Sequence, residues 1–462
     1  MLQDAAYNSL LLADRKALHR RIVDELGERL SNQPSVLARH CECAGDLETA
    51  FSCRLKSGDQ AVSQFANWEA VAQYWHALRL LEQMPDTEDR RRMHVDTVCR
   101  LIGVSGSYFW RDEDELRLAT QHLSAALEAS ERRGDLSVSA RLQAFIGEHS
   151  LDETLLRKAV DTAEAAGDAR VQAEVASRNA GFFGKVGRYE DSHEHVRRAI
   201  EIYGELGEEV RQGLSMASHG RCYHARAGKL KTSLHYARRM REIAERTGNR
   251  QLNSWLAMES EPYLYKGEWN RTIESAEEGL PSAWELGNWN VVLFSSAWAT
   301  IAHIKLGQLD AAQELMGRAM KEADRRATHD HPKMYPRIAL SQLELALGNR
   351  QAAMSAAREA HSMAERNLHG LEKGAACREL ARASAVIGDT MEAGARFRES
   401  LDVLGAIQCG PELAQSLLAY GRFKIAERAS DGREMLERAL GLFEAMGANG
   451  WVDETTIALQ NR

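Results

Sequence analysis

The sequence predicts an all-α fold, a solenoid of stacked helical hairpins, and three observations lead to this prediction. Six glycines recur at separations of 41, 39, 40, 41 and 40 residues, namely Gly187, Gly228, Gly267, Gly307, Gly348 and Gly388. Helix-forming sequence lies on both sides of each glycine, and small residues stand at fixed distances from it. The chain holds only 7 prolines, and no run of alternating β-branched residues indicates a sheet. A fixed period of this length is typical of an array of one supersecondary unit.

The small residues have a packing reason. Two antiparallel helices approach closely only where the side chains at their crossing are small, and glycine allows the tight turn between them. One such hairpin cannot bury its own apolar stripe, so neighbouring hairpins must stack into a continuous core. Arg221 and Met240 are the exceptions. The small residues stand seven positions before, five after and twelve after the glycines: Ala180, Ser260, Thr300, Ser341, Ala381, Ser192, Ser233, Thr272, Ala312, Ala353, Ala393, Ala199, Gly279, Ala319, Ala360 and Ser400.

Charge and cysteine content restrict the partners and the compartment. The formal net charge of −8 argues against nucleic-acid binding, which needs a basic face. An odd number of scattered cysteines, 7, suits a reducing compartment. The sequence shows no signal peptide and no uncharged run of membrane-spanning length. We therefore expect a cytoplasmic protein with no nucleic-acid or membrane partner.

The repeat pattern resembles a known family. The offsets of the small residues, with an aromatic residue or leucine two positions after the glycine (Tyr189, Leu230, Trp269 and Leu309), are similar to the tetratricopeptide repeat. That repeat usually spans about 34 residues, so a period near 40 resembles its longer-helix variant in large bacterial signalling proteins. The resemblance implies a right-handed α-solenoid of hairpins.

Both ends of the chain resemble one group of regulators. Asp4–Leu11 (DAAYNSLL) and Arg15–Ile22 (RKALHRRI) are similar to the end of the winged-helix region in STAND-type ATPases. Leu37–Ala50 (LARHCECAGDLETA) resembles the passage that opens the superhelix in class III adenylate cyclases and related regulators, and the text from Leu442 to Trp451 resembles their closing helix pair. These likenesses imply the repeat region of a bacterial signal-transduction ATPase or adenylate cyclase.

Four segments are expected from these observations. Residues 1–33 form an N-terminal helical segment, 34–134 irregular repeats, 135–447 regular repeats and 448–462 a C-terminal cap. Gly147 lies 40 residues before Gly187, so we expect it at the turn of an imperfect repeat. In the last repeat, we expect the turn glycine at Gly432.

Catalytic and metal-binding signals are weak. The segment from Gly220 to Lys229 lacks the spacing of a phosphate-binding loop, and His193-Glu194-His195 lacks the spacing of a zinc pair on one helix face. Cys41 and Cys43 on one helix point to different sides. His329-Asp330-His331 suggests surface residues before Pro332, and Gly103-Val104-Ser105-Gly106 is one residue short of a nucleophile elbow. We expect no enzyme activity from this chain alone, no metal and no cofactor.

A solenoid fold predicts a binding function. In the tetratricopeptide register the first helix of each pair lines the concave surface, and mixed aromatic and charged side chains there suit a peptide or protein segment. A small metabolite is the alternative ligand. Arg221 widens the helix crossing, extends into the groove or lies along the helix surface. Trp255, Trp284, Trp289 and Trp298, around two neighbouring repeats, serve either packing or binding. The candidate groove residues are Ser218, Arg221, Cys222, Arg226, Glu261, Tyr265, Phe294, Ile301, Lys305, Gln342, Arg378 and Arg382.

Overall fold

The computed structural model describes residues 11–64, 66–104, 113–325, 330–366 and 370–460. Within these ranges the chain is helical and contains no strand. The predicted all-α solenoid of tetratricopeptide-like hairpins is confirmed. The chain divides into two compact units, residues 1–149 and 150–462.

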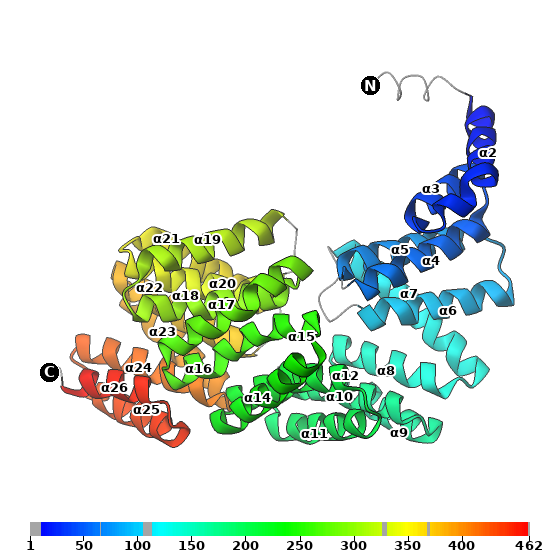
Figure 1. Cartoon of the computed structure of the whole chain (residues 1–462). Coiled ribbons are helices and arrows are strands. Elements are labelled where there is room, and N and C mark those ends of the chain that lie inside the picture. The colour runs from blue at the N-terminus through cyan, green and yellow to red at the C-terminus, as the bar shows by residue number, and fades with distance from the viewer. Residues whose placement is uncertain (1–10, 65, 105–112, 326–329, 367–369, 461–462) are drawn as a thin grey trace. The chain divides into compact units, whose positions relative to one another are not determined.

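The first unit contains seven described helices, each packed against the next (Figure 1). Its core is built from Phe51, Tyr74, Leu78, Leu101 and Phe145, all nearly fully buried. The helices are α2 (Leu12–Leu30), α3 (Pro34–Ala44), α4 (Leu47–Ser63), α5 (Asn67–Glu82), α6 (Glu88–Val104), α7 (Glu113–Arg133) and α8 (Leu136–Ser150).

The second unit contains the regular repeats. Its helices are α9 (Glu153–Ala166), α10 (Ala169–Lys185), α11 (Tyr189–Glu205), α12 (Glu209–Ser215), η1 (Met216–Arg221), α13 (Cys222–Arg226), α14 (Leu230–Thr247), α15 (Arg250–Trp255), η2 (Leu256–Glu259), α16 (Ser260–Lys266), α17 (Trp269–Leu286), α18 (Trp289–Lys305), α19 (Leu309–Arg325), α20 (Asp330–Ala346), α21 (Arg350–Arg366), α22 (Gly370–Ile387), α23 (Thr390–Ala406), α24 (Gly410–Ala426), α25 (Gly432–Met446) and α26 (Asn449–Gln460). The six predicted glycines end α10, α13, α16, α18, α20 and α22.

These glycines have the backbone conformation that the pattern requires. All six have positive φ, from 73° at Gly267 to 92° at Gly388, a region that side chains with a Cβ rarely adopt. At Gly187 the turn is a Schellman motif, in which the Arg188 amide donates to the Phe183 carbonyl at 2.8 Å. A second series of positive-φ glycines, which the sequence analysis did not identify, ends the second helices: Gly167, Gly207, Gly248, Gly287 and Gly447.

Two expected turn glycines lie elsewhere. Gly147 is inside α8, and the left-handed residue of that turn is Leu151, with φ 55°. Gly432 begins α25, and the turn before it has Arg428 in the left-handed conformation, with φ 58°. Arg428 lies 40 residues after Gly388, so the period continues through the last repeat although the glycine does not.

The small positions are buried at the helix crossings, as the packing argument requires. Ala180, Ser192 and Ala199 are all 0 % exposed. Hydroxyls at these positions also connect the two helices of a hairpin. Ser192 donates to the Ala180 carbonyl at 2.8 Å, and Ser341 donates to the Ala353 carbonyl at 3.0 Å.

The last helix of the second unit, α26, packs against its middle repeats (Figure 1). The Trp451 indole donates to the Leu264 carbonyl at 2.9 Å across 187 residues. A methyl group on Gly450 would lie 2.3 Å from the Gly267 oxygen, so the backbones of α26 and of the turn after α16 touch. Lys305 of α18 forms an ion pair with Glu454 at 2.6 Å.

The predicted division into segments 1–33, 34–134, 135–447 and 448–462 stays a prediction. The boundary between the compact units lies one helix beyond residue 134, because α8 packs with the first unit. Asp4–Leu10 of the resemblance at the N-terminus lies outside the described residues.

Candidate functional site

Polar side chains from five repeats meet within the second unit, on helices predicted to line its inner face. They lie on the first helices of their hairpins, η1 with α13, α16, α20, α22 and α24. We call them the inner-face network: Arg221, Arg226, Glu261, Tyr265, Tyr335, Gln342, Glu372, Arg378, Glu379, Arg382 and Glu412.

One part of the network is centred on Glu261. Its carboxylate is 1 % exposed and accepts from Arg221 Nη1 at 2.6 Å and from Arg226 Nε at 3.3 Å. Glu261 and Arg221 come from neighbouring repeats 40 residues apart. The ion pair therefore connects consecutive hairpins, from seven positions before Gly228 to six positions before Gly267.

A second part is centred on Glu412, which is fully buried. Its Oε1 accepts from the hydroxyls of Tyr335 at 2.7 Å and Tyr265 at 3.1 Å, and its Oε2 accepts from Arg378 Nη1 at 2.6 Å. Tyr265 and Glu412 are 147 residues apart, so this carboxylate connects the last repeats to the middle ones.

Glu379 extends the network to the edge of the inner face. Arg378 Nε donates to it at 3.0 Å, Gln342 Nε2 at 3.1 Å and Arg382 Nη1 at 2.7 Å. The Arg382 side chain is 38 % exposed while Glu379 is 0 % exposed. Solvent therefore contacts the network through Arg382.

Burial dominates the electrostatics of this site. It raises the pKa of Tyr265 and Tyr335 well above the usual value for a phenol, and it raises the pKa of Cys222 to about 12. It also raises the pKa of Glu372. Burial lowers the pKa of Arg378, but the Glu412 and Glu379 carboxylates outweigh it and hold that pKa above its ordinary value. The four arginines and four glutamates of the network balance in formal charge.

Beside Arg382 lies a second, more accessible group of charges. Lys305 is 23 % exposed, pairs with Glu454 and has its Nζ 4.2 Å from the centre of the Trp451 ring. Arg422 pairs with the other oxygen of Glu454 at 2.8 Å and is 46 % exposed. Burial lowers the pKa of Lys305. The charge of Glu454 raises it by less, so the pKa stays below its ordinary value.

The structure brings together eight of the twelve residues that the sequence placed on the groove: Arg221, Cys222, Arg226, Glu261, Tyr265, Gln342, Arg378 and Arg382. Lys305 lies in the group next to Arg382. Phe294 packs near the Trp298 and Tyr335 rings, and Ile301 is buried. Ser218 donates to the Leu214 carbonyl within its own helix at 2.7 Å. That any of these residues contacts a partner stays a proposal.

The sequence analysis missed Tyr335, Glu372, Glu379 and Glu412. Relative to the turn residue, most groove residues stand at −10, −6 or −2, with Arg221 at −7 and Phe294 at −13. Tyr335 also stands at −13, and Glu372, Glu379 and Glu412 stand at −16, −9 and −16. Offsets of −16, −13, −9, −6 and −2 follow one face of a helix. Extending the face by two turns, with Arg428 counted as the last turn residue, would have found all four.

Arg221 is buried and does not lie along the helix surface. It is 0 % exposed and stands at the end of η1, a π-helical stretch from Met216 to Arg221 inside an otherwise α-helical hairpin. Such local widening is typical of functional sites in helices. It lets this repeat accommodate a large cation at a crossing that is small in the other repeats.

The weak motifs have structural explanations. Gly228 has φ 77° at a repeat turn, and Lys229 pairs with Glu190, so the segment does not form a phosphate loop. The His193 ring stacks on His224 with centroids 3.6 Å apart. Cys41 is buried and Cys43 exposed, on opposite sides of α3. Ser105, Gly106 and His329 lie outside the described residues, as do the side chains of Asp330 and His331.

The four tryptophans take part in three sets of packing contacts. Trp284 and Trp289 form an edge-to-face pair, Trp298 packs on Phe294 and Tyr335, and Trp255 joins a core next to α14 and α15. Trp289 and Trp298 are at most 4 % exposed. These contacts agree with the packing interpretation.

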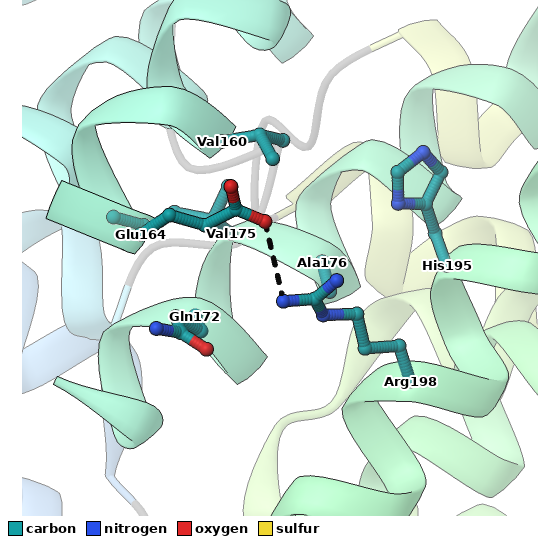
Figure 2. Close-up of a pocket in the computed structure, with 8 residues that line it drawn as sticks. Val160, Glu164, Gln172, Val175, Ala176, His195 and Arg198 are labelled. Atoms are coloured by element: carbon teal, nitrogen blue, oxygen red, sulfur yellow. Dashed lines mark hydrogen bonds and ion pairs between the residues drawn. The ribbon is translucent and has the colours of Figure 1, made fainter. Parts of the chain in front are cut away.

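A small pocket lies between α9, α10 and α11 (Figure 2). Val160, Val175 and Ala176 form its apolar wall, and the Glu164–Arg198 ion pair of 3.4 Å crosses it. Its free volume is about 40 Å³. At 10 to 15 Å³ of such volume per water, it has room for about three water molecules.

Comparisons with known proteins agree with the fold. No protein-family model matches the chain, and no curated protein matches its sequence. A Rap protein solved in complex with competence and sporulation factor is similar in structure, with a TM-score of 0.53 and 13% identity, covering 77% of this chain and 98% of that chain. Aspartyl phosphate phosphatase F from Bacillus subtilis has a TM-score of 0.50 and 14% identity, covering 78% and 94%.

A STAND protein with a tetratricopeptide repeat sensor from Pyrococcus horikoshii has a TM-score of 0.41 and 17% identity, covering 71% of this chain and 52% of that chain. At 13% and 14% identity, the first two structures show the fold alone. In the described part of the chain, no helix is both long and apolar enough to cross a membrane.

Proposed function

We propose that this chain is a non-catalytic scaffold that binds a peptide or protein segment at the inner face of its second unit. The observation that carries the proposal is the inner-face network. Buried ion pairs such as Arg221–Glu261 and Arg378–Glu412 contribute little net stability, because desolvation offsets their attraction. Replacement of a buried ion pair by well-packed apolar residues is often neutral or stabilising. The presence of these ion pairs on the face that a solenoid uses for binding is better explained by recognition and by the exact placement of neighbouring repeats.

The accessible edge of the network defines the chemistry of the segment. Arg382, Lys305 and Arg422 are the exposed or part-exposed cations there, at 38 %, 23 % and 46 %, against one part-exposed carboxylate, Glu454 at 22 %. The Trp451 ring lies beside Lys305. We therefore propose that the bound segment presents carboxylates to Arg382 and Lys305.

Two further facts support the proposal. The Rap protein of similar fold was solved with competence and sporulation factor bound, which is a precedent for a helical-repeat scaffold that holds a partner. The resemblance of residues 1–53 and 442–451 to regulator sequences favours a regulatory or sensing region of a bacterial signal-transduction ATPase or adenylate cyclase polypeptide. The pocket in Figure 2 does not favour the small-metabolite alternative, because about three waters would fill it.

A peptide-binding assay tests the site. A fluorescent peptide library of graded acidity is titrated against the whole chain, and the best acidic peptide is then measured against Arg382→Gln and the Arg226→Gln/Arg382→Gln double variant. We expect affinity to fall at least about tenfold with Arg382→Gln, since a charge-assisted hydrogen bond contributes about 1.5 to 3 kcal/mol. Arg398→Gln, an exposed arginine on α23, is the matched control and keeps full affinity.

Equal affinity of the Arg382→Gln and Arg398→Gln chains would contradict the proposed site. Equal binding of acidic and neutral peptides would contradict the proposed chemistry. The parentage is tested separately, by the genomic sequence upstream of Met1, where an in-frame phosphate-binding loop is expected.

A further inference from the structure

Three metal-ligand side chains meet away from the inner-face network. His361 on α21, Cys377 on α22 and Glu399 on α23 each place one nitrogen, sulfur or oxygen atom within 4.8 Å of the other two. Cys377 is 0 % exposed, whereas the side chains of His361 and Glu399 are 16 % and 28 % exposed. The sulfur lies at the bottom of the cluster, and an ion can enter past the imidazole and the carboxylate.

From this geometry we propose that His361, Cys377 and Glu399 form a Zn²⁺ site. Imidazole, thiolate and carboxylate are the three ligand types of protein zinc sites, at about 2.0 to 2.3 Å from the metal. Tetrahedral bonds of that length place ligand atoms about 3.3 to 3.8 Å apart. Contraction of a cluster already within 4.8 Å needs only small side-chain rotations. The fourth position remains for water or for a donor from a partner.

The surrounding charges fit a divalent cation. Glu365, Glu392 and Glu399 face two cations, Lys373 and Arg396, which leaves one excess negative charge while the Cys377 thiol is protonated. Binding of Zn²⁺ deprotonates the thiol, because only the thiolate is a ligand. The cluster then carries two negative charges, one in excess before and one on the thiolate, and the two positive charges of Zn²⁺ neutralise them.

Two existing contacts of Arg396 with the proposed ligands must change. Arg396 Nη1 lies 2.6 Å from Glu399 Oε2 and 3.4 Å from His361 Nε2. Its Nε also donates to Glu392 at 2.7 Å, so the guanidinium retains a carboxylate partner when it leaves Glu399. Arg396 therefore acts as the counter-ion of the metal-free cluster and is displaced on metal binding.

The site would connect consecutive repeats. α21 is the second helix of one hairpin, and α22 and α23 form the next. A metal bound to all three holds the hairpins in one relative orientation, close to Arg378 and Arg382 on α22. This inference does not depend on the proposed peptide site, and each can fail without the other.

Cobalt titration tests the proposal directly. The tag-free chain is stripped with a chelator and titrated with Co²⁺, whose bond to a thiolate gives a near-ultraviolet charge-transfer band, with visible bands when the site is tetrahedral. We expect one equivalent of Co²⁺ to saturate the band and Zn²⁺ to displace it. Glu399→Gln and His361→Gln should each weaken Zn²⁺ binding at least about tenfold in a competition assay, since even outer partners of zinc ligands matter by 10- to 100-fold.

Variants identify the thiolate. Cys377→Ala is expected to abolish the charge-transfer band, whereas Cys409→Ala, which removes an equally buried cysteine outside the cluster, leaves it unchanged. Circular dichroism checks that both variants fold, and Glu399→Gln serves if Cys377→Ala does not. Absence of the band in the parent chain, or its survival in Cys377→Ala, would overturn the assignment. Zn²⁺ affinity unaffected by Glu399→Gln and His361→Gln would do the same.

Discussion

Removing the charge of Glu412 should destabilise the second unit by about 3 kcal/mol. Its carboxylate is 0 % exposed and accepts from two tyrosine hydroxyls and from Arg378 Nη1 at 2.6 Å. Removing one partner of a buried ion pair costs about 3 to 5 kcal/mol. Glutamine at 412 keeps an oxygen for the hydroxyls, and Arg378 keeps Glu379 at 3.0 Å, so the lower end of that range applies.

Urea denaturation followed by circular dichroism measures this change. The midpoint should fall while the slope stays constant, because the surface exposed on unfolding is unchanged. Arg378→Met alone should also destabilise, and the Glu412→Gln/Arg378→Met double variant should cost less than the sum, by about 1 to 3 kcal/mol. Glu437→Gln, which breaks the exposed Arg433–Glu437 pair of 2.9 Å, is the control and should change stability by less than about 0.5 kcal/mol. The reasoning fails if Glu412→Gln is as neutral as Glu437→Gln.

Two further predictions concern pH and the last turn. His94 and His122 lie 2.8 Å apart in the first unit, where burial lowers the pKa of His94 to about 4 and also lowers that of His122. In the unfolded chain both histidines bind a proton near pH 6.5. The free energy of unfolding should therefore fall by about 2 to 3 kcal/mol for this pair between about pH 6.5 and pH 4. In denaturant titrations at each pH, a His94→Gln/His122→Gln chain should show a smaller dependence of stability on pH. An unchanged profile would contradict this. Arg428→Gly should raise stability by about 1 kcal/mol, since φ is 58° at this exposed residue. Gly388→Ala, at φ 92°, should lower stability. A lower melting temperature for Arg428→Gly would refute the strain argument.

The periodic glycines and small residues were enough to predict the hairpins. A crossing that tolerates only small side chains restricts the sequence, so the positions of Ala180, Ser192 and Ala199 hold small residues in the six glycine-marked repeats, except at Arg221 and Met240. The second series of turns at Gly207, Gly248 and Gly287 follows the same rule and was available in the sequence. The turn at Arg428 could not be predicted from the sequence, because a non-glycine residue can occupy a left-handed turn at a modest energetic penalty.

The candidate site was only partly predictable. Repeat register places Arg221 and Glu261 on one face, but it does not show that these side chains meet at 2.6 Å. The contact between Tyr265 and Glu412 depends on how tightly the solenoid winds, which is set by small rotations summed over several repeats. The His361, Cys377 and Glu399 cluster has no short spacing of the kind found in sequence motifs, because each ligand comes from a different helix.

The contact of α26 with α16 changes how the second unit should respond to stress. In an open linear array each repeat is coupled only to its neighbours, so damage at one end frays locally. Here the Trp451–Leu264 bond and the Lys305–Glu454 pair link non-adjacent hairpins. Unfolding of α26 would therefore also destabilise the middle repeats. A force or a ligand that displaces α26 would act on α16, which holds Tyr265, directly and not through the intervening repeats.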